Sequence, residues 1–313
     1  MKAMTNRVTV EGYLYEHALE LKVSGPNSKN PNTEYITGTI SIATDDACVN
    51  VVPVHYTYVT ATTSKGNPNA TFGVLKNIVD GVYGTIMADG KDKAVKLHVD
   101  TALDLNEFYS DRSGKEELVS AKRNEGGFVS KIDVLNEKEN LRNVFEVDMI
   151  ITGAVRREGD AERDIPEKVI VKGAIFNFRK ALLPVEFSAT HPNAMQYFEG
   201  LEATSKEPVF TKIKGTQISE TVIKTITEES AFGEASIREV KSSRKDFVIN
   251  WAAPAPYAWD DESTITAMEL NEAITARETY LATLKQKQDE YKAAKNAPSA
   301  AATAAIANNT FNF

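Results

Sequence analysis

The sequence predicts a mainly β protein in which two consecutive five-stranded barrels are followed by a helix and a disordered tail. From residue 6 to about residue 251, short runs rich in Val, Ile, Thr, Tyr and Phe alternate with clusters of Gly, Asn, Asp and Pro, which is typical of strands joined by turns. Five of these runs carry a glycine near the middle, where a strand that curls around a small barrel often bends. The order of the runs also repeats once along the chain.

Each half of the β region is expected to hold a short helix ahead of its last two strands. In the first half, expected strands at 6–15, 35–43 and 49–60 precede a helix at 69–81, and strands at 94–105 and 118–133 follow it. In the second half, strands at 144–157 and 168–179 precede a helix at 189–202, and strands at 208–227 and 236–251 follow it. This is the element order of the five-stranded Greek-key barrel called the OB-fold.

Changes in composition set the domain boundaries. Residues 134–143 are charged and poor in strand formers, so the two OB-like barrels are assigned to residues 1–138 and 139–255. Residues 256–297 are assigned to a C-terminal helix, because the segment after Thr266 lacks Gly and Pro and is rich in helix formers. Residues 298–313 contain few large apolar side chains and are expected to be a disordered tail.

The helix has a start signal and a thin apolar stripe. Thr266 with Glu269 three residues later matches the pattern of a capping box. A stripe of apolar side chains on one face should dock the helix onto the rest of the protein. The stripe is formed by Leu270, Ile274, Leu281 and Leu284.

Composition excludes several classes of protein. The chain has 313 residues with 36 basic and 44 acidic side chains, a formal net charge of −8, so it is not a uniformly basic nucleic-acid binder. No apolar run approaches the ~20 residues that span a bilayer, and no signal-peptide core is present, so a soluble, cytoplasmic protein with no membrane partner is expected. The single cysteine, Cys48, excludes an internal disulfide and a cysteine-rich zinc site.

No catalytic motif is found, and a non-catalytic protein without cofactor or metal is expected. The four histidines are scattered with no metal-ligand spacing, and no glycine-rich GK[ST] loop for nucleotide hydrolysis is present.

Strand parity predicts an outward face that mixes aromatic rings with cations and hydroxyl groups. Val169, Val171 and Ile175 should point inward, so Lys172 and Phe176 should point outward. Rings on which bases stack, beside cations that follow the phosphates, are what sequence-independent binding of single-stranded nucleic acid requires. The predicted binding residues are Arg7, Tyr13, Tyr15, Tyr35, Lys122, Arg123, Lys172, Phe176, Phe178, Lys180, Phe210, Lys212 and Lys214.

The first strand adds a resemblance to a known family. The segment TNRVTVEGYLYE, with Asn6, Arg7, Val8, Val10, Gly12 and Leu14 in the motif positions, resembles the start of bacterial and phage single-stranded DNA-binding proteins. The resemblance implies an OB barrel, single-stranded DNA as partner, and a role in replication or recombination in the host cytoplasm if the protein is phage-encoded. It also implies replication proteins as partners of the C-terminal helix or tail, although the acids of the family's C-terminal peptide are missing here.

Two other functions stay open. The exposed aromatic faces could be subunit contacts of a homo-oligomer, in a structural or assembly protein such as a phage particle component. The third alternative is a β-rich enzyme with an unrecognised site. Replacing the outward rings separates DNA binding from subunit contact. Loss of oligo-dT binding with unchanged stability would favour DNA binding over an assembly role.

Overall fold

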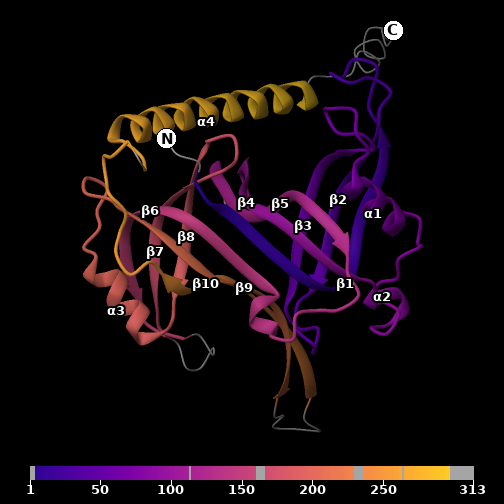
Figure 1. Cartoon of the computed structure of the whole chain (residues 1–313), viewed down its shortest axis with the longest axis horizontal. Helices are drawn as coiled ribbons and strands as arrows, with labels where there is room; N and C mark the ends of the chain where they lie inside the picture. The colour runs from indigo at the N-terminus through magenta and orange to yellow at the C-terminus, as the bar shows by residue number, and fades with distance from the viewer. Residues whose placement is uncertain (1–3, 113, 160–165, 229–235, 263, 297–313) are drawn as a thin grey trace, which may run out of the picture.

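The computed structural model describes residues 4–112, 114–159, 166–228, 236–262 and 264–296 (Figure 1). The protein is mainly β, with 49% of its residues in strands and 20% in helices, as the sequence predicts. The elements of the first half are β1 (Asn6–Val23), β2 (Glu34–Ala43), β3 (Val51–Thr60), α1 (Ala70–Val79), α2 (Ile86–Asp89), β4 (Lys96–Ser110) and β5 (Glu117–Lys131). Those of the second half are the 3₁₀ turn η1 (Glu139–Leu141), β6 (Asn143–Arg157), β7 (Lys168–Phe176), β8 (Leu182–Ala189), α3 (Pro192–Gly200), β9 (Val209–Glu228) and β10 (Ser236–Ala252), and α4 (Ala267–Asn296) follows.

The strands of the first half pair in a closed ring. Strand β1 pairs antiparallel with β2, and β2 with β3. Strand β3 pairs parallel with β5, and β5 returns through β4 to β1 in antiparallel pairs. The side chains of Val8, Val10 and Leu14 point into this ring and are fully buried, as their parity predicts.

The second half repeats the same order of pairing. Strand β6 pairs antiparallel with β7, and β7 with β8. Strand β8 meets β10 in a single parallel pair, Ser188 with Val248, and β10 returns through β9 to β6 in antiparallel pairs. Along the sequence, helix α3 comes between β8 and β9, as α1 and α2 come between β3 and β4.

The two halves are joined into one sheet and share one core. Residues Asn6–Val10 of β1 pair antiparallel with Asn143–Val147 of β6. A single apolar cluster includes Val10 and Leu97 of the first half together with Phe145 and Phe187 of the second. At the joint, the side chains of Asn124 and Gln217 exchange two buried hydrogen bonds of 2.9 and 3.1 Å.

Close backbone contacts explain two of the glycines inside strands. A Cβ atom at Gly38 would lie 2.0 Å from the Ala18 carbonyl oxygen of β1, and the φ of Gly38 is +126°. A Cβ atom at Gly173 would lie 2.0 Å from the Ile150 carbonyl oxygen of β6. Both glycines therefore permit neighbouring strands to approach closely where the sheet bends.

Helix α4 runs across both halves of the molecule (Figure 1). Its capping box forms as predicted, since the Glu269 N–H donates to Thr266 Oγ1 at 3.2 Å and the Thr266 N–H donates to Glu269 Oε2 at 3.1 Å. Leu270 packs against a small apolar cluster of the second half, whereas Ile274 is exposed. The predicted stripe is wrong at Ile274.

The turn after β7 and the strand that follows it differ from the prediction. The run expected at 168–179 stops at Phe176, and residues 177–181 turn into β8, which lies in a segment where no strand is expected from the sequence. Strand β8 contains Pro184, a residue that disfavours strands, although Pro184 here is exposed and lies opposite Ala174. Among the described residues, no helix combines the length and apolarity needed to cross a membrane. The predicted tail, 298–313, lies outside the described residues.

Candidate nucleic-acid interface

Several cations predicted to bind phosphates already have acidic partners on the same sheet face. Arg7 Nη2 lies 2.8 Å from Asp100 Oδ1. The Lys212 and Lys214 ammonium groups lie 3.0 and 3.1 Å from the carboxylate of Glu146. Burial acts to raise the pKa of Glu146, but hydrogen bonds from the two lysines hold it below its ordinary value. These three cations are therefore neutralised within the protein.

Lys172 and Arg123 are also paired. The Lys172 ammonium group lies 3.3 Å from Glu186 on the neighbouring strand β8. Arg123 Nε lies 2.9 Å from Glu125 Oε2, an ion pair whose geometry does not make a hydrogen bond. Arg123 nevertheless borders the cavity described below.

The predicted tyrosines of the first half lie on the outer side of β1 and β2 and are partly buried. The Tyr35 ring packs at 4.5 Å between centroids against Tyr58 of β3, and Tyr58 is exposed. The ammonium groups of Lys91 and Lys96 lie 5.0 and 5.8 Å from the centre of the Tyr13 ring. Tyr15 is half-buried on β1, at the point where the pairing with β2 shifts register.

Phe176 and Phe210 are buried, so the prediction that their rings stand on an open face is wrong. They retain 3% or less of their exposure and belong to a cluster separate from the main core that contains Ile175. Their parity is as predicted, but the segment that leads into α4 covers this side of the second half. Ile265 is fully buried in the same cluster, and the Tyr257 ring packs edge-on to Phe210 at 5.2 Å.

Lys122 is half-buried between the two halves. Its ammonium group lies 5.1 Å from the centre of the Phe187 ring and 4.5 Å from that of Phe247, and it donates to the Glu186 carbonyl oxygen. Burial lowers the pKa of Lys122 to about 8. Lys122 therefore links β5 of the first half to β8 and β10 of the second, and its contact with phosphate stays a prediction.

The turn between β7 and β8 presents an aromatic ring and two cations to solvent. Phe178 is 82% exposed, and the Arg179 guanidinium lies 5.1 Å from the centre of its ring. The Asn177 side chain accepts hydrogen bonds from the Arg179 and Ala181 N–H groups at 3.0 and 3.1 Å, which fixes the turn. Lys180 adopts a left-handed conformation with φ of 62°.

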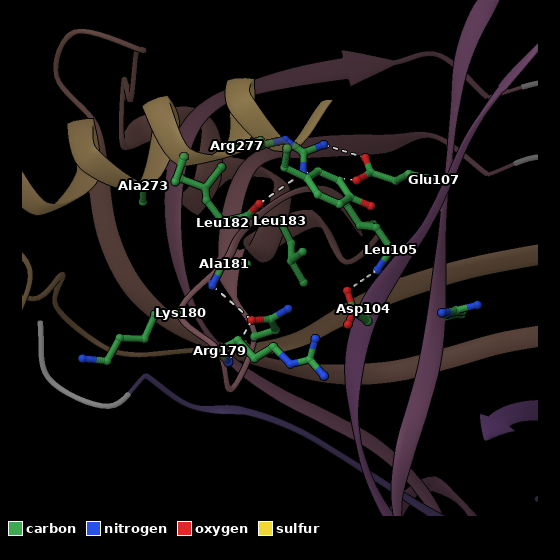
Figure 2. A pocket seen from close by; sticks show the side chains of 14 residues that line it. Asp104, Leu105, Glu107, Arg179, Lys180, Ala181, Leu182, Leu183, Ala273 and Arg277 are labelled. Atoms are coloured by element: carbon green, nitrogen blue, oxygen red, sulfur yellow. Dashed lines mark hydrogen bonds and ion pairs between the residues drawn. The ribbon is translucent and has the colours of Figure 1, made fainter. Parts of the chain in front are cut away.

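Arg179 and Lys180 are the free cations of this surface. Within the part of the chain that the structure describes, neither has an ion pair with an acid. Both border a cavity of about 360 Å³ between β4, β5, the start of β8 and α4 (Figure 2). The other residues that line it are Asp104, Leu105, Glu107, Arg123, Asn177, Ala181, Leu182, Leu183, Ala273, Ala276, Arg277 and Tyr280.

The cavity is locally basic on an acidic protein. Arg277 is held by Glu107 at 2.5 Å and donates to the Leu182 carbonyl oxygen at 3.2 Å, so its charge is already used (Figure 2). Asp104 accepts a hydrogen bond from the Leu105 N–H at 2.8 Å. With Arg277 paired to Glu107 and Arg123 paired to Glu125, Arg179 and Lys180 face one remaining acid of the lining, Asp104, which leaves the cavity weakly attractive to an anion such as a phosphate.

Of the thirteen predicted residues, the structure brings Arg123 and Lys180 to the lining of this cavity, and Phe178 stands in the chain between two lining residues, Asn177 and Arg179. Sequence reasoning missed Arg179, Arg277 and Tyr280. The run Asn177–Lys180 could have revealed Arg179, because an asparagine that can bond to its own backbone signals a turn. Arg277 and Tyr280 lie far along the sequence on α4, and no local signal places them here.

Similarity to known proteins is found in the sequence and in the fold. The profile of the YorF family matches residues 5–287. The chain belongs to the YorF family. No curated protein matches the sequence of this YorF-family protein.

A solved structure of a deletion mutant of the single-stranded DNA-binding protein from Thermus aquaticus is similar to it, with 10% identity and a TM-score of 0.44. That similarity covers 84% of this chain and 100% of the Thermus chain, and it is too weak to transfer a property. Among the described residues, no group of His, Cys, Asp or Glu side chains is arranged to hold a metal ion.

Proposed function

We propose that this YorF-family protein binds single-stranded DNA without catalysis and with little sequence preference. The observation that carries the proposal is the β7–β8 turn: Phe178 is 82% exposed and stands beside Arg179 and Lys180 at the rim of a basic cavity. A flat exposed ring can stack on any base, and adjacent free cations can follow the phosphates.

The order of strand pairing supports the same function. In each half the first strand pairs with the second, the second with the third, the third with the fifth, the fifth with the fourth, and the fourth with the first. This order, with a helix between the third and fourth strands, is that of an OB-like barrel, whose second and third strands commonly bind oligonucleotides. We therefore propose OB-like barrels in residues 1–138 and 139–255.

The corresponding face of the first half offers a second stacking surface. Tyr35 of β2 and Tyr58 of β3 form a ring pair on the outside, and Tyr58 is 42% exposed. Thr39 of β2 and His55 of β3 lie 3.1 Å apart further along the same two strands. Aromatic rings can stack on bases, and nearby hydroxyl and imidazole groups can bond to the sugar–phosphate backbone. Both halves of the protein therefore contribute to the proposed path of the DNA strand.

The direct test measures binding of labelled oligo-dT by fluorescence anisotropy at two salt concentrations, with duplex DNA for comparison. Phe178→Ala should weaken binding by about 1–3 kcal/mol if the ring stacks on one base. Arg179→Gln with Lys180→Gln should also reduce the salt dependence, by about 0.7 in slope for each phosphate that is no longer bound. Tyr291→Ala is the matched control, because it removes a 69%-exposed ring that lies on α4 and away from the β7–β8 turn. This variant should bind oligo-dT as wild type does.

Unchanged affinity of the Phe178 variant, with an unchanged salt slope of the Arg179 and Lys180 variant, would contradict the proposal. It would favour the alternative of an assembly protein whose exposed rings are subunit contacts. A role in replication or recombination, the phage setting, the cytoplasmic location and replication proteins as partners stay predictions of the sequence resemblance.

A further inference from the structure

Six strands form one continuous outer sheet across the joint between the two halves. The strands pair in the order β5, β4, β1, β6, β9 and β10, with three strands from each half. The inner side of this sheet carries the core residues Val8, Val99, Val129, Phe145 and Ile213, each at most 4% exposed. No described element of the protein covers the exposed rings at the two ends of its outer side.

A row of side chains crosses this outer side from strand to strand, with a step of two residues between β1 and β4. Arg7 is the register partner of Glu146, Glu146 of Lys214, and Lys214 of Trp251. In the other direction, the Arg7 guanidinium bonds to Asp100, and Asp100 is the register partner of Phe128. We call Phe128, Asp100, Arg7, Glu146, Lys214 and Trp251 the outer charge row.

The outer charge row alternates in charge and ends in an aromatic ring on both sides. From β5 to β10 it consists of an aromatic ring, an acid, a base, an acid, a base and an aromatic ring. Phe128 is 79% exposed and Trp251 is 45% exposed. Two exposed rings on one sheet face are candidates for contact with a partner, and the charges between them limit which partner fits.

The alternation makes the row complementary to its own reverse. Consider a second copy rotated by 180° about an axis that runs along the strands, between the two faces and midway between β1 and β6. Arg7 of each copy then faces Glu146 of the other, and Lys214 faces the strand that carries Asp100. The strand that carries Phe128 then faces the strand that carries Trp251 of the other copy. Each contact between two different residues occurs twice in this arrangement, once from each copy, as a two-fold interface requires.

We propose that the outer charge row is a homodimer interface in which two copies pack their six-stranded faces together. Sheets that pack face to face lie ~10 Å apart, a distance that long charged side chains and large rings can fill. The proposal is independent of DNA binding, because the β7–β8 turn and its cavity contain no residue of the row.

The size of the face sets the expected strength. Six strands ~4.8 Å apart, with about five residues each at ~3.3 Å per residue, offer roughly 480 Å² per copy. A standard stable interface buries about 800 Å² per partner. The dimer should therefore dissociate reversibly, with a dissociation constant on the order of micromolar, and it should weaken with added salt.

Sedimentation velocity without DNA, at about 1 to about 200 μM protein, tests the proposal by charge exchange. Arg7→Glu alone places an acid against Glu146 of the other copy, and Glu146→Arg alone places a base against Arg7 of the other copy, so each variant should associate at least about tenfold more weakly. An equal mixture of the two should form a heterodimer, because Glu at position 7 then faces Arg at position 146. Lys172→Glu, on β7 outside the row, is the control and should dimerise normally.

Two results would overturn the proposal: a wild-type protein that stays monomeric throughout this range, or a mixture of the two variants that stays monomeric. Far-ultraviolet circular dichroism melting of each variant shows that it is folded. Phe128→Ser leaves the ion pairs of the row in place and should also weaken the dimer. Equal dimerisation of this variant and wild type would count against the proposed face. Loss of the dimer with intact oligo-dT binding would leave the proposed function standing.

Discussion

Phe176 and Phe178 are two positions apart, and their exposed fractions are 2% and 82%. Phe176 is the last residue of β7 and lies beneath the segment that leads into α4. Phe178 belongs to the turn that follows, where strand parity no longer applies. The two rings must therefore be changed one at a time, since each reports on a different property.

Phe176→Ala should lower the free energy of unfolding by about 3–5 kcal/mol, because it removes a buried ring from a packed cluster. Phe178→Ala should change it by less than about 0.5 kcal/mol, because the ring is in solvent. Urea denaturation of the two single variants checks both values. Equal loss of stability in the two would mean that the Phe178 ring is packed.

At the scale of the element, α4 is attached by different forces at its two ends. Its first turns pack on apolar side chains of the second half, through Leu270 and Ala273. Further along, the Gln288 side chain bonds to the backbone of Tyr109, and Lys285 and Lys292 pair with Glu116. The attachment of α4 to the first half is therefore mainly polar and should weaken as salt rises.

The ion pair between Arg277 and Glu107 is the most buried of these contacts, with 13% and 2% of the two side chains exposed. Arg277→Met should lower the free energy of unfolding by about 3–5 kcal/mol, because it leaves the Glu107 carboxylate buried without its partner. Adding Glu107→Met should restore most of that loss, since an apolar pair of similar volume is often neutral. Chemical denaturation of the single and double variants measures the difference, and equal losses would argue against a buried pair.

At the scale of the whole molecule, the joint between the halves contains a titratable cation. Lys122 of the first half lies among Phe187 and Phe247 of the second, and burial lowers its pKa from 10.5 to about 8. Below pH 8 the lysine is protonated in both the folded and unfolded states. Between about pH 8 and 10.5 the unfolded chain binds more protons, so stability should rise with pH across this range.

The Lys122 contribution should reach about 3 kcal/mol when complete. Other groups also titrate at alkaline pH, so the measurement is the difference between wild type and Lys122→Met in urea denaturation from about pH 7 to pH 10.5. Only the wild type should show the part of the rise in the free energy of unfolding that comes from Lys122. Parallel pH profiles of the two proteins would mean that the lysine is solvated in the folded state.

Local patterns in the sequence were enough to predict most of the elements and the repeat of their order. Alternating apolar residues and interrupting glycines mark strands locally, and Thr266 with Glu269 marks the start of α4. Inward and outward parity was also predictable, since Val169, Val171 and Ile175 are buried in the main core. Strand β8 was missed because Pro184 and the preceding turn obscure a short run.

Which part of the outward face stays free depends on tertiary contacts that no local pattern records. The segment that leads into α4 covers Phe176 and Phe210, acids from neighbouring strands neutralise Lys212 and Lys214, and the second half encloses Lys122. Each of these partners is far away in sequence. Parity assigns a side chain to the outside of its own strand, but the packing of distant segments determines whether that outside meets solvent.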